Sequence, residues 1–352
     1  TYTSGELDGT YTKPAAAADV TCTFTNTRPS TGLTLTKTWT DAAAGDCVDL
    51  AIVGEAGTDT GATRGDGTTT DDATLTVYSG EVVDLSEAFD PGDADWYDTG
   101  LSCTAGDLTY TADELTAELE ITSTASPITC TFTNDRRTAN VVVAKDIAPD
   151  TDGGLFDLSI NGVVELADAG DGDATDPVSV LVGDPVSVSE AAGTGTDLAG
   201  YGSSLACDNG VVPNPNSGVA GGFDVPDTLA DGATITCTFT NTRKSAELTL
   251  TKDWVNGATG DAVSLTASGD SGNSLAALGS SAAPDTDADA VLMVWAGEDV
   301  TLTEAYADAN VGSYTADLTC TDANGLTYTD LVLTGTYAVP STPVDVTCTF
   351  VN

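Results

Sequence analysis

The chain has 352 residues and a formal net charge of −45, because 55 Asp and Glu residues face only 10 Lys and Arg residues. Such an acidic surface repels nucleic acid and anionic membranes, so we exclude both as partners. The sequence contains no His, which excludes Ser-His-Asp and Cys-His catalytic groups, and no apolar run is long enough to span a membrane.

A five-residue sequence recurs along the chain and divides it into repeats. Cys-Thr-Phe-Thr-Asn occurs at 22–26, 130–134 and 237–241, and Cys-Thr-Phe-Val-Asn follows at 348–352. The spacing between successive copies is about the length of one small domain, which is typical of a tandem array. We therefore predict three full repeats, at residues 29–136, 137–243 and 244–352.

Residues 1–28 precede these repeats and correspond to the end of one. Thr1–Asn26 aligns without gaps with Thr327–Asn352, and the two segments share Thr-Tyr-Thr, Gly-Thr-Tyr and Asp-Val-Thr-Cys-Thr-Phe. We expect this segment to form the C-terminal strands of a preceding, incomplete repeat, with the array continuing before Thr1. The alternative is a true N-terminus that lends its strands to a neighbouring subunit.

The sequence within each repeat alternates with a period of two. The first repeat opens with Leu33, Leu35 and Lys37 separated by threonines, and the other two open in a similar way. Short runs of Thr, Val, Tyr and Leu that are broken by Gly, Asp and Pro are typical of antiparallel strands. We predict an all-β fold, with an Ig-like antiparallel β-sandwich of roughly seven short strands in each repeat.

The links between repeats are very short, which favours a stiff rod over flexibly joined domains. Five of the ten cationic residues lie at these links: Arg28, Arg136, Arg137, Arg243 and Lys244. We expect them to neutralise acidic loops where successive domains meet. The alternative is a scatter of solvated charges, each contributing little to stability.

Six of the eight cysteines recur as one pair per repeat. The pairs are Cys103 with Cys130, Cys207 with Cys237, and Cys320 with Cys348. Such a pattern predicts one disulfide per domain and an oxidising compartment outside the cytosol. A zinc site is disfavoured because the chain has neither His nor Cys-x-x-Cys. We expect Cys22 to pair with a residue before Thr1, and a bond between Cys22 and Cys47 is the alternative.

Three polar residues of each repeat occupy positions that the strand alternation assigns to the core. Lys37 follows two leucines on its strand face, Glu87 follows a valine and a leucine, and Asn134 follows a cysteine and a phenylalanine. All three side chains should therefore point inward. The equivalent residues of the later repeats are Lys145, Glu190 and Asn241, then Lys252, Glu304 and Asn352.

Burial would lower the pKa of each lysine and raise the pKa of each glutamate. The lysine then becomes a neutral amine beside the carboxamide of the asparagine, and the glutamic acid can polarise that amide and move the protons. The predicted product is a Lys–Asn isopeptide bond formed once within each domain, with loss of ammonia. The alternative is a buried hydrogen-bonded network without a covalent bond.

The motifs that carry these residues are Leu-Thr-Leu-Thr-Lys, Val-Asp-Leu-Ser-Glu and Cys-Thr-Phe-Thr-Asn-Asp-Arg, or their equivalents in the other repeats. Their order and spacing resemble the CnaB-type (SpaA-like, prealbumin-like) domains of bacterial surface adhesins and pilins. The resemblance implies that a first-strand lysine joins a last-strand asparagine, assisted by a glutamate from a middle strand. A disulfide on the last strand departs from most of that family.

The resemblance and the residues together predict an extracellular structural array: a stalk, fibre or pilus-like shaft that associates with copies of itself or with further repeats, head to tail. Enzymatic activity is limited to the single-turnover formation of the isopeptide bonds. The alternative function is an adhesin whose repeats bind a host, glycan or matrix ligand directly.

One acidic loop raises the question of a cofactor. Its aspartates are Asp168, Asp171, Asp173 and Asp176. Closely spaced carboxylates are ligands that calcium prefers, but the loop lacks the full twelve-residue pattern with its terminal Glu. Calcium is therefore an alternative interpretation of this loop, and the sequence requires no other cofactor.

Overall fold

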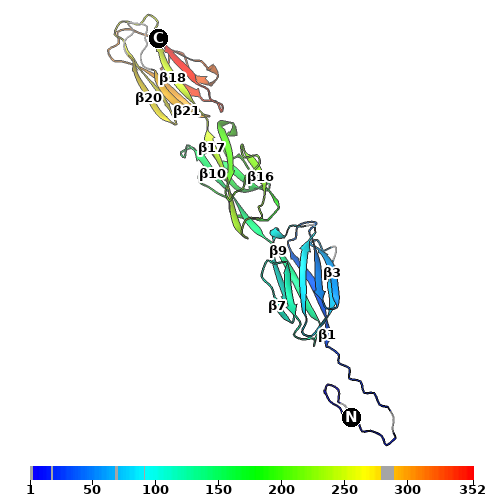
Figure 1. Ribbon diagram of the computed structural model, residues 1–352. Helices are drawn as coiled ribbons and strands as arrows, with labels where there is room; N and C mark the ends of the chain where they lie inside the picture. The colour runs from blue at the N-terminus through cyan, green and yellow to red at the C-terminus, as the bar shows by residue number, and fades with distance from the viewer. Residues whose placement is uncertain (1–2, 17–18, 68–69, 91, 279–288) are drawn as a thin grey trace. The chain divides into compact units, whose positions relative to one another are not determined.

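The computed structural model describes residues 3–16, 19–67, 70–90, 92–278 and 289–352. It contains three β-sandwiches in tandem, each built from two sheets, so the prediction of an all-β fold is confirmed (Figure 1). In the described part of the chain, three short 3-10 helices accompany the strands: Ala94–Trp96, Leu198–Gly200 and Ala323–Gly325. No helix among the described residues has the length and apolar character needed to cross a membrane.

The first sandwich contains strands β1 to β9. Its first sheet has the order β4 (Ala73–Tyr78), β1 (Ser30–Thr40), β9 (Ile128–Arg136), β6 (Tyr97–Cys103). Its second sheet has the order β3 (Gly57–Arg64), β2 (Cys47–Gly54), β5 (Val82–Phe89), β8 (Thr116–Glu120), β7 (Asp107–Thr109).

The second sandwich repeats this plan with a smaller second sheet. Its first sheet has the order β13 (Val178–Leu181), β10 (Thr138–Ala148), β17 (Ala233–Arg243), β15 (Tyr201–Cys207). Its second sheet has the order β12 (Val163–Ala169), β11 (Phe156–Ile160), β14 (Pro185–Ala192), β16 (Ala220–Asp224).

The third sandwich has the same sheet sizes as the first. Its first sheet has the order β21 (Ala290–Trp295), β18 (Ser245–Asp253), β26 (Val346–Val351), β23 (Asp317–Cys320). Its second sheet has the order β20 (Gly272–Leu278), β19 (Val263–Gly269), β22 (Asp299–Tyr306), β25 (Thr334–Ala338), β24 (Leu326–Thr327).

Each sandwich has its own core, formed where the inward-facing residues of its two sheets meet. The phenylalanine of the recurring five-residue sequence is fully buried in all three, as Phe132, Phe239 and Phe350. Burying one such side chain stabilises a domain by about 1.5 to 3 kcal/mol. This accounts for the phenylalanine in the three copies that lie within the sandwiches.

The first and last strands of every sandwich are parallel neighbours, whereas the other strand pairs with a described register are antiparallel. The ladder of β1 and β9 runs from Leu33 opposite Ile128 to Thr40 opposite Asp135, and β10 with β17 and β18 with β26 pair in the same way. Because these two strands point in one direction, the chain enters each sandwich at one end and leaves it at the other.

The chain divides into two compact units. The first comprises Thr1–Ala94 and Asp98–Asp135, and the second comprises Asp95–Tyr97 and Arg136–Asn352, which holds the second and third sandwiches.

The described residues of the N-terminal segment, 3–16 and 19–29, form no strand. The similar sequence in the third sandwich does form β24, β25 and β26, which pair with one another or with β18, β22 and β23. Strand formation depends on such ladders, since an extended segment alone satisfies neither its backbone groups nor its apolar side chains.

Candidate functional site

The predicted lysine, glutamate and asparagine converge in the core of each sandwich. The lysine comes from the first strand and the asparagine from the parallel last strand, while the glutamate comes from a middle strand of the facing sheet: β5, β14 or β22. In the first sandwich Lys37 lies opposite Phe132, so Asn134 is the next inward-facing residue of the neighbouring strand. The flexible lysine side chain spans this short diagonal.

The first site is closed to solvent. The Nζ atom of Lys37 lies 2.5 Å from Oε2 of Glu87, and both side chains are 0% exposed. The rings of Trp39 and Phe132 lie 4.9 and 5.9 Å from the same Nζ atom. Burial lowers the pKa of Lys37 to about 8, although Glu87 acts in the opposite direction. Burial also raises the pKa of Glu87.

The second site has a looser ion pair. Nζ of Lys145 lies 3.5 Å from Oε2 of Glu190, and it donates hydrogen bonds of 3.0 Å to the carbonyl oxygens of Asp146 and Phe239. Burial lowers the pKa of Lys145. The ring of Phe156 lies 4.4 Å from the lysine nitrogen.

In the third site the asparagine is engaged as well. Nζ of Lys252 lies 3.7 Å from Oε1 of Glu304, and Nδ2 of Asn352 donates a 2.7 Å hydrogen bond to that oxygen. Burial raises the pKa of Glu304. The Trp254 ring lies 4.6 Å from the lysine nitrogen.

The three asparagine amides are buried with incomplete hydrogen bonding. Asn134 adjoins Glu87, yet neither its Oδ1 nor its Nδ2 makes a hydrogen bond of ordinary geometry, and the same holds for both atoms of Asn241 and for Oδ1 of Asn352. A buried polar group left in this state costs about 1 to 3 kcal/mol. Each sandwich therefore buries a lysine–glutamate pair and, on the strand next to the lysine, an asparagine amide with unsatisfied polar atoms.

The sequence reasoning missed one member of the second site. Trp39 and Trp254 follow their lysines by two residues and pack on them, but the equivalent position of the second repeat is Ile147. There the neighbouring sheet supplies Phe156, the first residue of β11, which is fully buried against Lys145. The only signal in the sequence is an aromatic residue shortly after a first strand that lacks the tryptophan.

One disulfide lies in each sandwich and joins the last strand to its antiparallel neighbour in the same sheet. The bonds are Cys103–Cys130, Cys207–Cys237 and Cys320–Cys348. Cys22 and Cys47 are free, so the alternative bond between them is not present in the structure.

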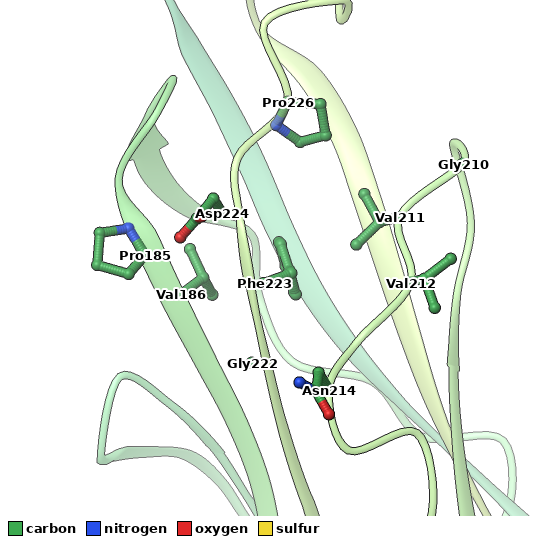
Figure 2. Close-up of a pocket in the computed structure, with 10 residues that line it drawn as sticks. All are labelled: Pro185, Val186, Gly210, Val211, Val212, Asn214, Gly222, Phe223, Asp224 and Pro226. Carbon is green, nitrogen blue, oxygen red and sulfur yellow. The ribbon is translucent and has the colours of Figure 1, made fainter.

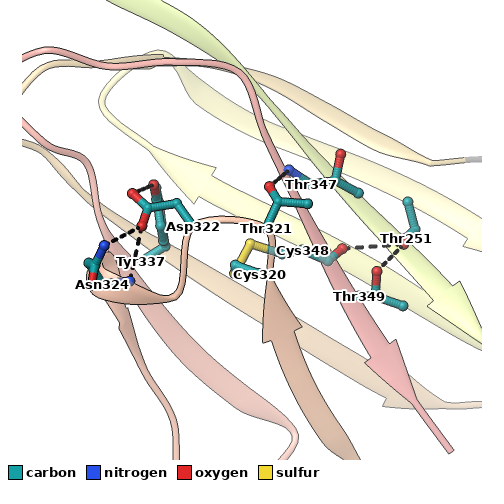
Figure 3. The surroundings of a disulfide bond; sticks show 9 residues. All are labelled: Thr251, Cys320, Thr321, Asp322, Asn324, Tyr337, Thr347, Cys348 and Thr349. Carbon is teal, nitrogen blue, oxygen red and sulfur yellow. Dashed lines mark hydrogen bonds between the residues drawn. A yellow bond between two sulfur atoms is a disulfide. The ribbon is translucent and has the colours of Figure 1, made fainter.

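Figure 3 shows that the last strand of the third sandwich is held on both sides. On one side is the disulfide of Cys348, and on the other Thr251 of the first strand donates to the carbonyl oxygen of Cys348 at 3.3 Å. The Thr251 hydroxyl also lies 2.8 Å from that of Thr349. The asparagine-bearing strand is therefore fixed close to the lysine-bearing strand.

The four aspartates considered for calcium do not form a single cage. Asp168 accepts hydrogen bonds from Thr194, Asp171 accepts one from the backbone of Ile147, and Asp173 accepts one from the backbone of Gly170. No group of three or more Asp, Glu, Cys or His residues in the described part of the chain is arranged to hold a metal ion. In the structure Asp168, Asp171 and Asp173 accept hydrogen bonds from groups of the protein itself.

The second sandwich has one further surface feature, a groove beside β16. Figure 2 shows Phe223 at its centre, with Pro185 and Val186 on one side and Val211 and Val212 on the other. In the first and third sandwiches a fifth strand, β7 or β24, lies at the corresponding sheet edge. Here only an isolated bridge between Asn214 and Gly222 occurs, so the edge remains open.

Comparison with known protein families gives a match over most of the chain. The sequence profile described as the prealbumin-like fold domain matches three times, over residues 32–136, 167–243 and 255–352. No curated protein matches the sequence.

Several solved structures have a similar arrangement of strands at low sequence identity. The Bacillus anthracis TIE protein is 13% identical with a TM-score of 0.47, and the match covers 91% of this chain and 50% of that one. The pilus adhesin SpaC from Lactobacillus rhamnosus GG, in its open conformation, is 13% identical with a TM-score of 0.31, covering 92% and 43%. The major pilin from Streptococcus pyogenes is 11% identical with a TM-score of 0.26, covering 62% and 99%. This chain spans half or less of the length of the first two.

Proposed function

The chain belongs to the family of prealbumin-like fold domains, and on that premise we propose that it is an extracellular structural array whose sandwiches are each closed by a Lys–Asn isopeptide bond. The observation that carries the proposal is the threefold recurrence of one buried site. In each copy a desolvated lysine contacts a glutamate beside an asparagine amide with unsatisfied polar atoms. The cross-links would join Lys37 to Asn134, Lys145 to Asn241, and Lys252 to Asn352.

The proposed reaction needs no external reactant. The neutral lysine Nζ attacks Cγ of the asparagine side chain, and the protonated glutamate donates its proton to the amide as the tetrahedral intermediate forms. The glutamate then carries one lysine proton to the original amide nitrogen, which leaves as ammonia, and it takes back its own proton from the oxygen as the carbonyl re-forms. A C–N bond to lysine replaces the C–N bond of the amide, so Glu87, Glu190 and Glu304 act once each and are regenerated.

The bond would change how the sandwich responds to tension. A force that enters β1 at Ser30 would run to Lys37, cross to Asn134 and leave at the end of β9. The residues between Lys37 and Asn134 would then carry no load. By the loop-closure model used for disulfides, closing about 100 residues also stabilises a domain by about 4 to 5 kcal/mol.

The features of such an array are consistent with an extracellular location. One disulfide per sandwich is stable in an oxidising compartment, and the family includes bacterial surface proteins by the resemblance described above. The strongly acidic composition keeps neighbouring chains apart. We propose that the partners are further repeats or further copies, joined head to tail in a stalk, fibre or pilus-like shaft.

The test is the intact mass of the full chain after disulfide reduction. We expect the mass to fall short of the sequence mass by three ammonias. The Glu87→Gln variant should fall short of its own sequence mass by only two. The matched control is Glu81→Gln, because Glu81 is buried in the same sandwich and its carboxylate makes no hydrogen bond among the described residues. That variant should still lose three ammonias, whereas a full mass for the unmodified chain would exclude the cross-links.

The alternative of direct ligand binding has one specific location, the groove beside β16. Its volume of about 540 Å³ is within the range of small-molecule sites, and Val212 at its edge is 75% exposed. A glycan or peptide array probed with the full chain and with Val212→Asp would test this function. Binding that saturates and is lost in Val212→Asp would support the adhesin alternative over a purely structural role.

A further inference from the structure

An arginine lies two residues after the asparagine in the first three copies of the five-residue sequence, and it contacts a turn further along the chain. The three are Arg28, Arg136 and Arg243. In every case Nε donates to a backbone carbonyl oxygen: that of Ser79 at 2.8 Å, Val182 at 2.9 Å and Ala296 at 2.9 Å, respectively. These acceptors occupy the same turn in each sandwich, between the edge strand of the first sheet and the strand that carries the glutamate.

The turn has the same construction in all three copies. A glycine follows the acceptor residue with a positive φ, as Gly80 at 77°, Gly183 at 82° and Gly297 at 78°. This left-handed conformation favours glycine. Three sandwiches of divergent sequence thus keep one backbone shape at the point where the arginine binds.

A carboxylate completes each of these sites. The guanidinium lies 2.6 Å from Glu55 in the first sandwich, 2.9 Å from Asp184 in the second and 3.3 Å from Asp270 in the third. A carbonyl oxygen beside a carboxylate matches the forked donors of a guanidinium better than the single ammonium group of lysine. We define this turn and its carboxylate as the arginine socket.

Arg243 is held from a second side. Its guanidinium lies 3.1 Å from Oδ2 of Asp152, whose side chain is 2% exposed, and the hydroxyl of Tyr201 donates to the other oxygen of Asp152 at 2.6 Å. Burial and the hydrogen bond to Asp152 raise the pKa of Tyr201, which keeps its hydroxyl protonated as a donor. Asp152 and Tyr201 belong to the second sandwich, whereas Asp270 and Ala296 belong to the third.

From these contacts we propose that the arginine socket of the third sandwich is an inter-domain docking site for Arg243, and that Arg243 thereby sets the angle between the second and third sandwiches. Only Lys244 separates β17 from β18, and its Nζ donates to the carbonyl oxygen of Ala199 at 2.8 Å. The joint therefore has one linking residue and a shared guanidinium. This proposal does not depend on whether the isopeptide bonds form.

The burial of the site separates it from an ordinary surface ion pair, which contributes little to stability. The Arg243 side chain is only 17% exposed, and its donors reach two carboxylates and a carbonyl oxygen. Replacing it with a small apolar residue would leave the Asp152 carboxylate buried without its cation, which is costly. The joint would respond by opening to water, and the two sandwiches would then move independently.

The test measures the distance between the two sandwiches in the full chain. Spin labels carried by unnatural amino acids at Val164 and Leu275, both exposed, report this distance by pulsed electron resonance without using cysteine. We expect a narrow distribution for the parent chain and a width at least about twofold larger for Arg243→Ala, because domains without a tight joint move freely. Arg243→Lys should also broaden the distance distribution, since lysine lacks the paired N–H donors of a guanidinium.

The matched control is Arg64→Ala, which removes an exposed cation of the first sandwich and should leave the distribution unchanged. Intact mass and thermal unfolding of Arg243→Ala show whether its domains remain folded and keep their ammonia deficit. A distribution for Arg243→Ala as narrow as that of the parent chain would overturn the proposal.

Discussion

At the scale of single residues, the balance between desolvation and ion pairing determines what the buried lysine can do. Glu87 contacts Lys37 and favours its charged form, yet burial outweighs this attraction and brings the lysine pKa to about 8. At pH 7 roughly a tenth of such amines are neutral. The same burial keeps a proton on Glu87 to higher pH. Burial therefore shifts both groups toward their uncharged forms, the amine that attacks and the acid that donates a proton, which exposure to water would not do.

This balance predicts a pH dependence for a first sandwich that cannot form its bond. In Asn134→Ala, Lys37 titrates near pH 8 when folded and near 10.5 when unfolded. Between these values the unfolded chain binds more protons, so the free energy of unfolding should rise with pH, by up to about 3 kcal/mol. Glu87, whose folded pKa is raised, contributes with the opposite sign: its stabilisation is lost as pH rises through that pKa.

Calorimetry of the full chain between pH 8 and 10.5 measures this effect, with the first transition identified by its shift in Asn134→Ala. The double variant Asn134→Ala, Lys37→Met is the control, and its free energy of unfolding should not rise with pH through the lysine. The free energy of unfolding of the parent chain should not rise either, because the amide nitrogen of a cross-linked lysine does not titrate in this range. An equal rise in the parent chain would contradict the proposal that the cross-link forms.

Strand alternation was sufficient to predict which residues of the site share the core, because side chains on alternate positions face the same side. It was not sufficient to predict their partners. That β1 and β9 are parallel, and that Glu87 reaches across from the other sheet, depend on sheet order, which leaves no local trace in sequence. Phe156 was missed for the same reason. The arginine acceptors were invisible because they are backbone carbonyl groups.

At the scale of elements, the last strand is the part of each sandwich with the most attachments. In the first sandwich β9 lies between β1 and β6, with the disulfide of Cys130 toward β6 and Asn134 beside the lysine of β1. The two covalent links would have different roles. The disulfide closes a short segment within the sandwich, whereas the isopeptide bond connects the strands through which the chain enters and leaves.

Replacing the first disulfide in a Cys103→Ala, Cys130→Ala variant should therefore reduce stability without preventing the isopeptide bond. For a loop with a separation of 27 residues, the chain-entropy model gives a loss of about 3 to 4 kcal/mol. Calorimetry measures the loss, and the mass of the variant should still fall short by three ammonias. Cys47→Ala, which alters a buried free cysteine, is the control and should have a smaller effect. A deficit of two ammonias would mean that the disulfide must hold β9 before the bond can form.

At the scale of the whole molecule, the sequence predicted a tandem array, and the parallel first and last strands of each sandwich explain why such domains can be linked in series. Tension applied to the two ends of the chain reaches every domain through this pair of strands. The cross-link between them should make each sandwich inextensible. Stability and extensibility therefore have separate origins. The packing of the whole core determines how stable a sandwich is, whereas one covalent bond per domain determines whether it can lengthen under tension.

Pulling the full chain by its ends in a force spectrometer tests this separation. The parent chain should show no stepwise lengthening of its three sandwiches. Asn134→Ala should add one step of roughly 250 Å, because about 80 residues of the first sandwich become free to extend while its disulfide retains the rest. Under reducing conditions that step should lengthen by roughly 90 Å, as the 27-residue disulfide loop is released.

Arg243→Ala should add no step of this kind, because a released joint frees no folded residues. Three steps in the parent chain would show that its sandwiches are held by hydrogen bonds and disulfides alone.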